Sequence, residues 1–188
     1  LLLTEKVILP KENFHRADMI YYLVTRVRIP ENERYYDFFV DSEDRLFIDD
    51  LLKKRGIPED AKIVVLHVGG NWRLKRWPQE SFAFLIDALV ERYGVQVVIT
   101  GDFIDYPLAT EIAARTRHKP FVACGLTTLK QLGALLERAN LVVANDSGPM
   151  HIAVAVKART IALFGPTSPS LTGPYGKGNY RVMVGKPP

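Results

Sequence analysis

Residues 62–67 read Lys-Ile-Val-Val-Leu-His (KIVVLH), a short run dominated by β-branched and other apolar side chains. Such a run is typical of a strand that is covered on both faces, as in a parallel sheet. Residues 80–93 follow with apolar side chains at helical spacing, and Gly94 ends that pattern. A second apolar run, VQVVIT at 95–100, predicts another buried strand. The stretch therefore predicts a strand, a crossover helix and a parallel strand.

The same alternation continues toward the carboxyl terminus. Thr128 and Gln131 have capping-box spacing at the start of one predicted helix. The tail from Gly165 is rich in Gly and Pro and is expected to be loop, with a last strand at 181–184. We predict helices over 106–115, 128–139 and 149–156, and strands over 121–123, 141–144 and 160–164. The fold class is therefore α/β, a Rossmann-like parallel sheet with helices on both faces.

The segment before this alternation predicts the domain organisation. Residues 1–30 combine an extended opening over Leu1–Leu9 with a short helical stretch around Ala17–Arg26, which is typical of a connector. Because the chain opens in what resembles a strand, we interpret these residues as an interdomain connector and the end of a preceding amino-terminal domain. Residues 31–188 are then one domain, whose first helix is expected over 42–55 with Ser42 as its N-cap and Gly56 as its stop.

Composition limits the function classes. Apolar residues make up 47% of the chain and charged residues 24%, which is ordinary for a globular protein. The net charge of +4 suits a phosphate-bearing ligand or an anionic membrane surface without requiring either. Basic residues do not form blocks interleaved with aromatic ones, so we expect no nucleic-acid partner.

Cysteine, histidine and hydropathy patterns narrow the classes further. Cys124 is the only cysteine, which excludes an internal disulfide and fits a reducing, cytoplasmic compartment. The four histidines show no metal-ligand spacing, so no metal site is expected. No apolar run approaches the ~20 residues that span a bilayer, and Leu1–Leu3 lacks the features of a signal peptide.

Ligands of such sheets bind where the strands end and helix N-termini converge. The loops 68–78, 101–105 and 145–151 follow predicted strands, and the loop 165–175 adjoins them. In the third loop Asp146 or Ser147 could cap the next helix, Gly148 permits close approach, and His151 lies in the first turn. Free amides at that helix start could hold a diphosphate, although the same turn is typical of a capped helix in any α/β protein.

The first of these loops offers glycines and cations. Gly69 and Gly70 precede Asn71. Three cations follow within four residues, Arg73, Lys75 and Arg76, and could neutralise phosphate. A solvated surface loop has the same composition. The motifs GxxxxGK[ST], GxGxxG and GxSxG are absent, which argues against a Walker ATPase, an ordinary NAD-dependent oxidoreductase and a serine hydrolase.

Three stretches, in this order, resemble the signature of bacterial ADP-heptose:lipopolysaccharide heptosyltransferases, glycosyltransferase family nine. They are HVGGN at 67–71 with KRWP at 75–78, NDSGPMHIA at 145–153 and LFGPTSP at 163–169. The stretches GLTTL at 125–129 and His15-Arg16-Ala17-Asp18, with Leu3-Thr4 before it, are similar to the family as well. Lys157 and Arg159 depart from it, because they stand where the family commonly has a glycine and a proline.

The resemblance implies a GT-B enzyme with two Rossmann-like domains, of which this chain is the carboxyl-terminal, donor-binding half. It implies inverting, metal-independent transfer of a heptose from ADP-heptose to the lipopolysaccharide inner core, with no cofactor beyond the ADP-sugar. A lipid-linked oligosaccharide acceptor would bind through the other domain, and contact with the inner membrane would be peripheral. A non-catalytic nucleotide-sugar-binding module, or a paralogue that uses another nucleotide sugar, is the alternative.

The resemblance also implies roles for individual residues. Lys75 matches a contact to the donor phosphates, and Asp146 matches an acidic residue at the donor sugar. Ser147, Gly148 and His151 match the loop that cradles the diphosphate. Further donor contacts are expected from Asn71 and Met150, and Asp102 and Asp105 compete for the ribose. No catalytic residue is assigned, since the family supplies its base from the other domain.

Overall fold

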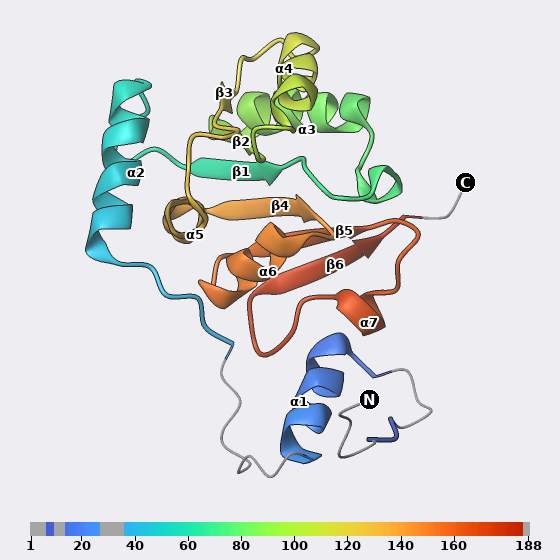
Figure 1. Ribbon diagram of the computed structural model, residues 1–188. Coiled ribbons are helices and arrows are strands. Elements are labelled where there is room, and N and C mark those ends of the chain that lie inside the picture. The colour runs from blue at the N-terminus through green and yellow to red at the C-terminus, as the bar shows by residue number, and fades with distance from the viewer. Residues whose placement is uncertain (1–6, 10–13, 27–35, 186–188) are drawn as a thin grey trace.

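The computed structural model describes residues 7–9, 14–26 and 36–185. It confirms the predicted fold class, because all neighbouring strands of its six-stranded sheet run parallel (Figure 1). The strand order is β3-β2-β1-β4-β5-β6. Strands β2 and β3 therefore lie on one side of β1, and β4, β5 and β6 lie on its other side. The strand order thus reverses between β1 and β4, and this switch point is where ligands bind in such sheets. The strands are β1 Ile63–His67, β2 Gln96–Thr100, β3 Phe121–Val122, β4 Leu141–Asn145, β5 Thr160–Phe164 and β6 Tyr180–Val184.

Helices cover both faces of this sheet, as predicted. Alternate residues of β1 point to opposite faces: Ile63 and Val65 pack with α2, α5 and α6, whereas Val64 and Leu66 pack with α3 and α4. In Figure 1, α3 and α4 lie together beside β2, away from α5 and α6. The helices are α1 Arg16–Arg26, α2 Ser42–Lys54, α3 Gln79–Tyr93, α4 Tyr106–Ala114, α5 Leu129–Arg138, α6 Gly148–Ala155 and α7 Pro169–Thr172, with a 3-10 turn η1 at Arg73–Lys75.

Helix ends confirm some predictions and correct others. Thr128 and Gln131 form the predicted capping box of α5, and Gly94 ends α3 in the left-handed conformation. The N-cap of α2 is Asp41 instead of Ser42, because the Asp41 carboxylate accepts the Asp44 amide and the Asp44 carboxylate accepts the Asp41 amide. The predicted loop after Gly165 contains the short helix α7, and η1 was not predicted either.

The amino-terminal predictions are tested only in part. Helix α1 confirms the expected helical stretch, and Val7–Leu9 shows no strand. The remainder of the expected opening strand, Leu3-Thr4 and the domain boundary at 30/31 lie outside the described residues. In the described ranges, no helix combines the length and apolar character that crossing a bilayer requires.

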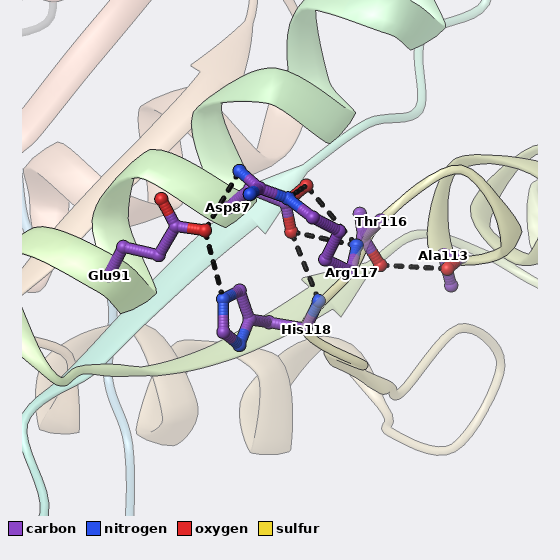
Figure 2. Close-up of polar contacts among 6 residues, drawn as sticks. All are labelled: Asp87, Glu91, Ala113, Thr116, Arg117 and His118. Carbon is purple, nitrogen blue, oxygen red and sulfur yellow. Dashed lines mark hydrogen bonds and ion pairs between the residues drawn. The ribbon is translucent and has the colours of Figure 1, made fainter.

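A buried carboxylate fixes the connection between α4 and the edge strand β3. Asp87 on α3 accepts hydrogen bonds from the backbone amides of Arg117 and His118 at 2.9–3.2 Å, and Arg117 also pairs with Glu91 at 2.8 Å (Figure 2). Burial raises the pKa of the Asp87 carboxyl, but the amide hydrogen bonds and the Arg117 guanidinium together outweigh burial and leave the pKa lowered. The loop that precedes β3 is thus held on α3.

The departure at Lys157 coincides with a strained backbone. Its φ of 63° makes it the one non-glycine residue with positive φ in the part of the chain that the structure describes. A side chain in this conformation costs about 1 kcal/mol or more. Glycine, which the resemblance implies at this position, is therefore the residue that the turn after α6 favours.

We expect Lys157→Gly to raise the free energy of unfolding by up to about 1 kcal/mol, because it removes the left-handed strain. Urea unfolding followed by circular dichroism measures this. Lys53→Gly, in the last turn of α2, is the matched control and should lower the same free energy by up to about 1 kcal/mol. A loss of stability in both variants would show that the turn at Lys157 is not strained.

Candidate functional site

Asn145 ties the ends of two adjacent strands together. It is the last residue of β4 and is fully buried. Its side-chain nitrogen donates to the carbonyls of Val68 and Gly69, at 3.0 and 3.1 Å, and its side-chain oxygen accepts the Trp77 amide at 3.0 Å. One amide side chain therefore supplies hydrogen-bond partners for backbone groups at both ends of the loop that follows β1. This contact holds the predicted cation loop against the loop that begins at Asp146.

Asp146 is the centre of a polar cluster at this edge of the sheet. Its side chain is 4% exposed, and its Oδ2 lies 2.8 Å from the Lys75 ammonium. The same oxygen accepts the hydroxyl of Thr167 at 2.7 Å and that of Thr172 at 3.4 Å. Segments after β1, β4 and β5 thus meet at one carboxylate. The sequence predicted that Lys75 and the 145–151 loop would lie together, and they do.

The start of α6 differs from the prediction. Ser147 is the N-cap, but no side chain caps the helix: the Ser147 hydroxyl donates to the Asn145 carbonyl, and Asp146 is engaged with Lys75. The predicted side-chain cap is therefore wrong. A Cβ built on the exposed Gly148 meets nothing within 4 Å, so the first turn of α6 faces open space. The helix begins with its partial positive charge directed toward that space.

Asp102 and Asp105 lie in one loop but differ in environment. Each accepts the backbone amide of the other, at 3.0–3.2 Å. Asp105 is 6% exposed, lies 3.4 Å from the Arg76 guanidinium and occupies the space that a side chain at Gly69 or Gly101 would need. Burial raises the pKa of Asp105. Asp102 is exposed, so of the two it is the carboxylate available to a ligand.

Two histidines at the site are kept neutral by burial. Burial lowers the pKa of His67 to about 4, against an opposing effect of Asp102, and its Nδ1 lies 3.2 Å from the Thr100 hydroxyl. His151 is half-buried and packs edge-on against Tyr36, with ring centroids 6.3 Å apart. Burial lowers the pKa of His151; Asp146 opposes this effect and Lys75 adds to it. At neutral pH the His151 imidazole is therefore uncharged and can donate or accept one hydrogen bond.

These groups border a cavity of about 650 Å³ along the carboxyl ends of the strands, which is the size of pockets that hold small ligands. Of the predicted site residues, every one except Met150 contributes to its wall. Among the described residues, no group of three or more His, Cys, Asp or Glu side chains is placed to hold a metal ion. The wall residues used below are Arg16, Asn71, Lys75, Asp102, Asp105, Asp146, Ser147, Gly148, His151 and Thr172.

Met150 does not face the cavity, contrary to the expected donor contact. Its side chain is fully buried in the cluster formed by β1, β4, α5 and α6, so the expected donor contact by this side chain is wrong. Sequence reasoning also missed contributors. Asn145 was quoted only as part of the turn, and Thr167 and Thr172 only as loop. Tyr36 carried no sequence signal, since it stands outside every motif.

A sequence model of glycosyltransferase family 9 (heptosyltransferase) matches residues 17–187. Lipopolysaccharide heptosyltransferase 3 of Escherichia coli strain K12 is 35% identical over 162 residues, which cover 78% of this chain and 46% of that protein.

The chain is also similar to solved structures of this family. A glycosyl transferase family 9 protein from Veillonella parvula superposes with a TM-score of 0.86 at 27% identity, covering 98% of this chain and 53% of that one. The ADP-heptose lps heptosyltransferase II of E. coli gives a TM-score of 0.72 at 27% identity, covering 82% and 47%. The chain thus spans about half the length of these relatives.

We expect Asn145→Ala to lower the free energy of unfolding by about 3 kcal/mol, because it leaves buried backbone groups of the loop after β1 without partners. Asn140→Ala is the control: Asn140 accepts the Ile63 amide at 2.8 Å, at the opposite end of the strands. It should cost about 1 kcal/mol. Hydrogen exchange of residues 72–78 should accelerate in Asn145→Ala alone; equal exchange in both variants would contradict the role of Asn145 as a tie.

Stability should fall on acidification through His67. In the unfolded chain this histidine binds a proton near pH 6.5, whereas in the folded protein its pKa is about 4. The unfolded state therefore holds more protons between these values, and the folded state loses up to about 3 kcal/mol as the pH falls from 6.5 to 4. His67→Gln should flatten this dependence in urea unfolding at pH 7, 5.5 and 4.5. An unchanged slope would exclude His67 as its source.

Proposed function

The chain belongs to glycosyltransferase family 9, and on that premise we propose that it is the donor-binding part of a glycosyltransferase that transfers a heptose from ADP-heptose to the lipopolysaccharide inner core. The names of its relatives, a lipopolysaccharide heptosyltransferase and an ADP-heptose lps heptosyltransferase, support this donor and this acceptor. Because the chain spans about half of those proteins, activity and acceptor are proposals for the whole enzyme.

The observation that carries the proposal is the Lys75–Asp146 pair beside the uncapped start of α6. The donor diphosphate would lie over Ser147 and Gly148, where backbone amides and the helix dipole favour an anion. The Lys75 ammonium would neutralise its charge, and Asp146 would accept hydroxyls of the sugar. His151, as a neutral imidazole, would donate a hydrogen bond to a phosphate oxygen.

The order of the strands gives the donor a direction along the cavity. Asp102 follows β2, on one side of β1, whereas Lys75, Asp146 and α6 lie around β1 and β4. We therefore place the nucleoside toward β2, with the exposed Asp102 at the ribose and Asp105 as its buried support. Asn71, which is exposed at the cavity wall, would contact the donor from the loop after β1.

The proposed reaction is inverting, with the acceptor hydroxyl attacking from the side opposite the diphosphate. Departure of ADP places negative charge on a phosphate oxygen. Lys75 and the amides of α6 would stabilise this charge more in the transition state than in the bound donor, which is what accelerates the step. In this proposal Lys75 supplies the cation in place of a metal, and no cofactor takes part.

The proposed reaction also needs a base, an acceptor and a location. We assign the base that deprotonates the acceptor to no residue of this chain. We propose that the acceptor is a lipid-linked oligosaccharide. We also propose that the whole enzyme contacts the inner membrane peripherally. A donor other than ADP-heptose is the competing possibility that the binding experiment distinguishes.

We expect Lys75→Ala to weaken ADP binding about 10- to 100-fold, because it removes a charge-assisted contact to the diphosphate worth about 1.5–3 kcal/mol. Asp146→Asn should weaken the binding of ADP-heptose relative to that of ADP, because Asp146 is proposed to accept hydroxyls of the sugar. Isothermal titration calorimetry measures this. Lys54→Ala, on the exposed surface of α2, is the control and should leave the affinity unchanged.

UDP and GDP, titrated in parallel with ADP, test the choice of nucleotide. Stronger binding of either would transfer the proposal to another nucleotide sugar. Full affinity for ADP in Lys75→Ala would remove Lys75 from the diphosphate site, and an unchanged ratio of ADP-heptose to ADP affinity in Asp146→Asn would remove Asp146 from the sugar site.

A further inference from the structure

A cation from outside the sheet borders the donor cavity. Arg16 is the first residue of α1, a helix that belongs to the predicted connector. It contributes to the same cavity wall as Ser147, His151 and Thr172. Figure 1 shows α1 beside α7, below the edge of the sheet that carries β5 and β6. None of the motifs that define the sheet predicts a role for this helix in binding.

His15 fixes the start of α1 on α7. Its Nδ1 lies 3.1 Å from the Ala17 amide, which must donate, so the ring proton is on Nε2. That nitrogen lies 3.0 Å from the Gly173 carbonyl and therefore donates to it. A side chain at Gly173 would overlap the Pro169 carbonyl, which explains the glycine at the acceptor of this bond. The residue next to Arg16 is thus held by a directed hydrogen bond.

Aromatic packing strengthens this attachment. The His15 ring stacks on Tyr175, with centroids 4.8 Å apart and an interplanar angle of 25°. The Tyr175 hydroxyl donates to Asp18, on the first turn of α1. Tyr36 packs edge-on against both Tyr175 and His151. Four rings therefore run from the connector to the start of α6, and they place α1 relative to the cavity.

Helix α7 connects this attachment to the Lys75–Asp146 pair. Thr172 hydrogen-bonds the Asp146 carboxylate, and the next residue, Gly173, accepts the bond from His15. These contacts place Arg16 on the side of the cavity with Asp146 and Thr172, which follow β4 and β5, whereas Asp102 follows β2, on the other side of β1. A donor that lies with its nucleoside toward Asp102 presents its distal phosphate to the Arg16 end.

We propose that Arg16 is a binding residue of the donor site that contacts the phosphate farther from the nucleoside. This inference rests on the proposed function. Lys75 is already paired with Asp146, so its charge is partly offset before a ligand binds. Among the described residues no acidic side chain forms an ion pair with Arg16, and its planar guanidinium matches two phosphate oxygens. The connector thereby becomes part of the donor site, with His15 as the positioning residue for Arg16.

The test compares nucleotides that differ by one phosphate. In calorimetric titrations of the full chain, Arg16→Ala should weaken ADP binding about tenfold and leave AMP binding within about twofold. Arg16→Lys should recover part of the loss, since it restores a point charge without the fork. Arg26→Ala is the matched control: Arg26 is in the last turn of α1, stacks on Tyr22 and should change neither affinity.

The positioning role of His15 is tested by a double-mutant cycle. His15→Ala should reproduce most of the ADP-specific loss, and adding it to Arg16→Ala should cause no further loss, because both act through one contact. Additive losses would overturn the positioning role. Circular dichroism confirms that each variant is folded, and the ratio of ADP to AMP affinity is insensitive to the fraction of active protein.

The outcomes separate this inference from the proposed function. If the parent chain and Lys75→Ala both fail to bind ADP, the proposed function fails. If the parent binds ADP and Lys75→Ala weakens it while Arg16→Ala does not, the function holds and the Arg16 inference is overturned. Equal weakening of ADP and AMP by Arg16→Ala would also overturn it, because the contact would then not involve the distal phosphate.

Discussion

The Asp146 carboxylate is nearly inaccessible to water, and burying such a charge is unfavourable unless a cation and hydrogen-bond donors surround it. Lys75 supplies the cation, and Thr167 and Thr172 supply hydroxyls. A buried ion pair of this kind often stabilises a protein no more than packed apolar side chains would. The pair is therefore explained more readily by what it presents to the cavity than by the stability of the domain. Its requirement for partners brings the segments after β1, β4 and β5 to one point.

The sheet could be predicted because its signals are local. KIVVLH at 62–67 and VQVVIT at 95–100 each hold consecutive apolar residues without polar alternation, which is typical of strands buried on both faces, and both became interior strands of the sheet. Helix α3 and its end at Gly94 followed from spacing and from one glycine. Helix α7 was missed because a single turn over Pro169–Thr172 has too few residues to show periodicity. The N-cap of α2 was displaced by one residue because Asp41 and Ser42 are both good caps, and only the reciprocal bond with Asp44 distinguishes them.

The site was predictable in its location and less so in its contacts. Parallel topology places every strand-to-helix loop at one edge, so Lys75 and the 145–151 turn could be expected together. Which side chain serves the ligand and which serves the scaffold depends on partners distant in sequence. Asp105 is committed to Arg76 and to the space beside Gly69, whereas Asp102 is exposed, and neither fact is visible in the run 101–105. Met150 lies in the first turn of α6 as expected, but helical rotation directs it into the core.

Rigid placement distinguishes this site from a cluster of surface charges. The Asn145 side chain hydrogen-bonds backbone groups at both ends of the loop that contains Lys75. The position of the Lys75 backbone is therefore fixed independently of its flexible side chain. The hydroxyls of Thr167 and Thr172 orient the carboxylate from the opposite side. Under the proposed function, binding of the donor diphosphate would require little reordering of side chains, because the entropy that an exposed lysine loses on binding would largely be lost already on folding. The same reasoning applies to the connector, because an arginine on a freely moving segment would lose more entropy on binding than one whose neighbouring residue is already hydrogen-bonded to Gly173.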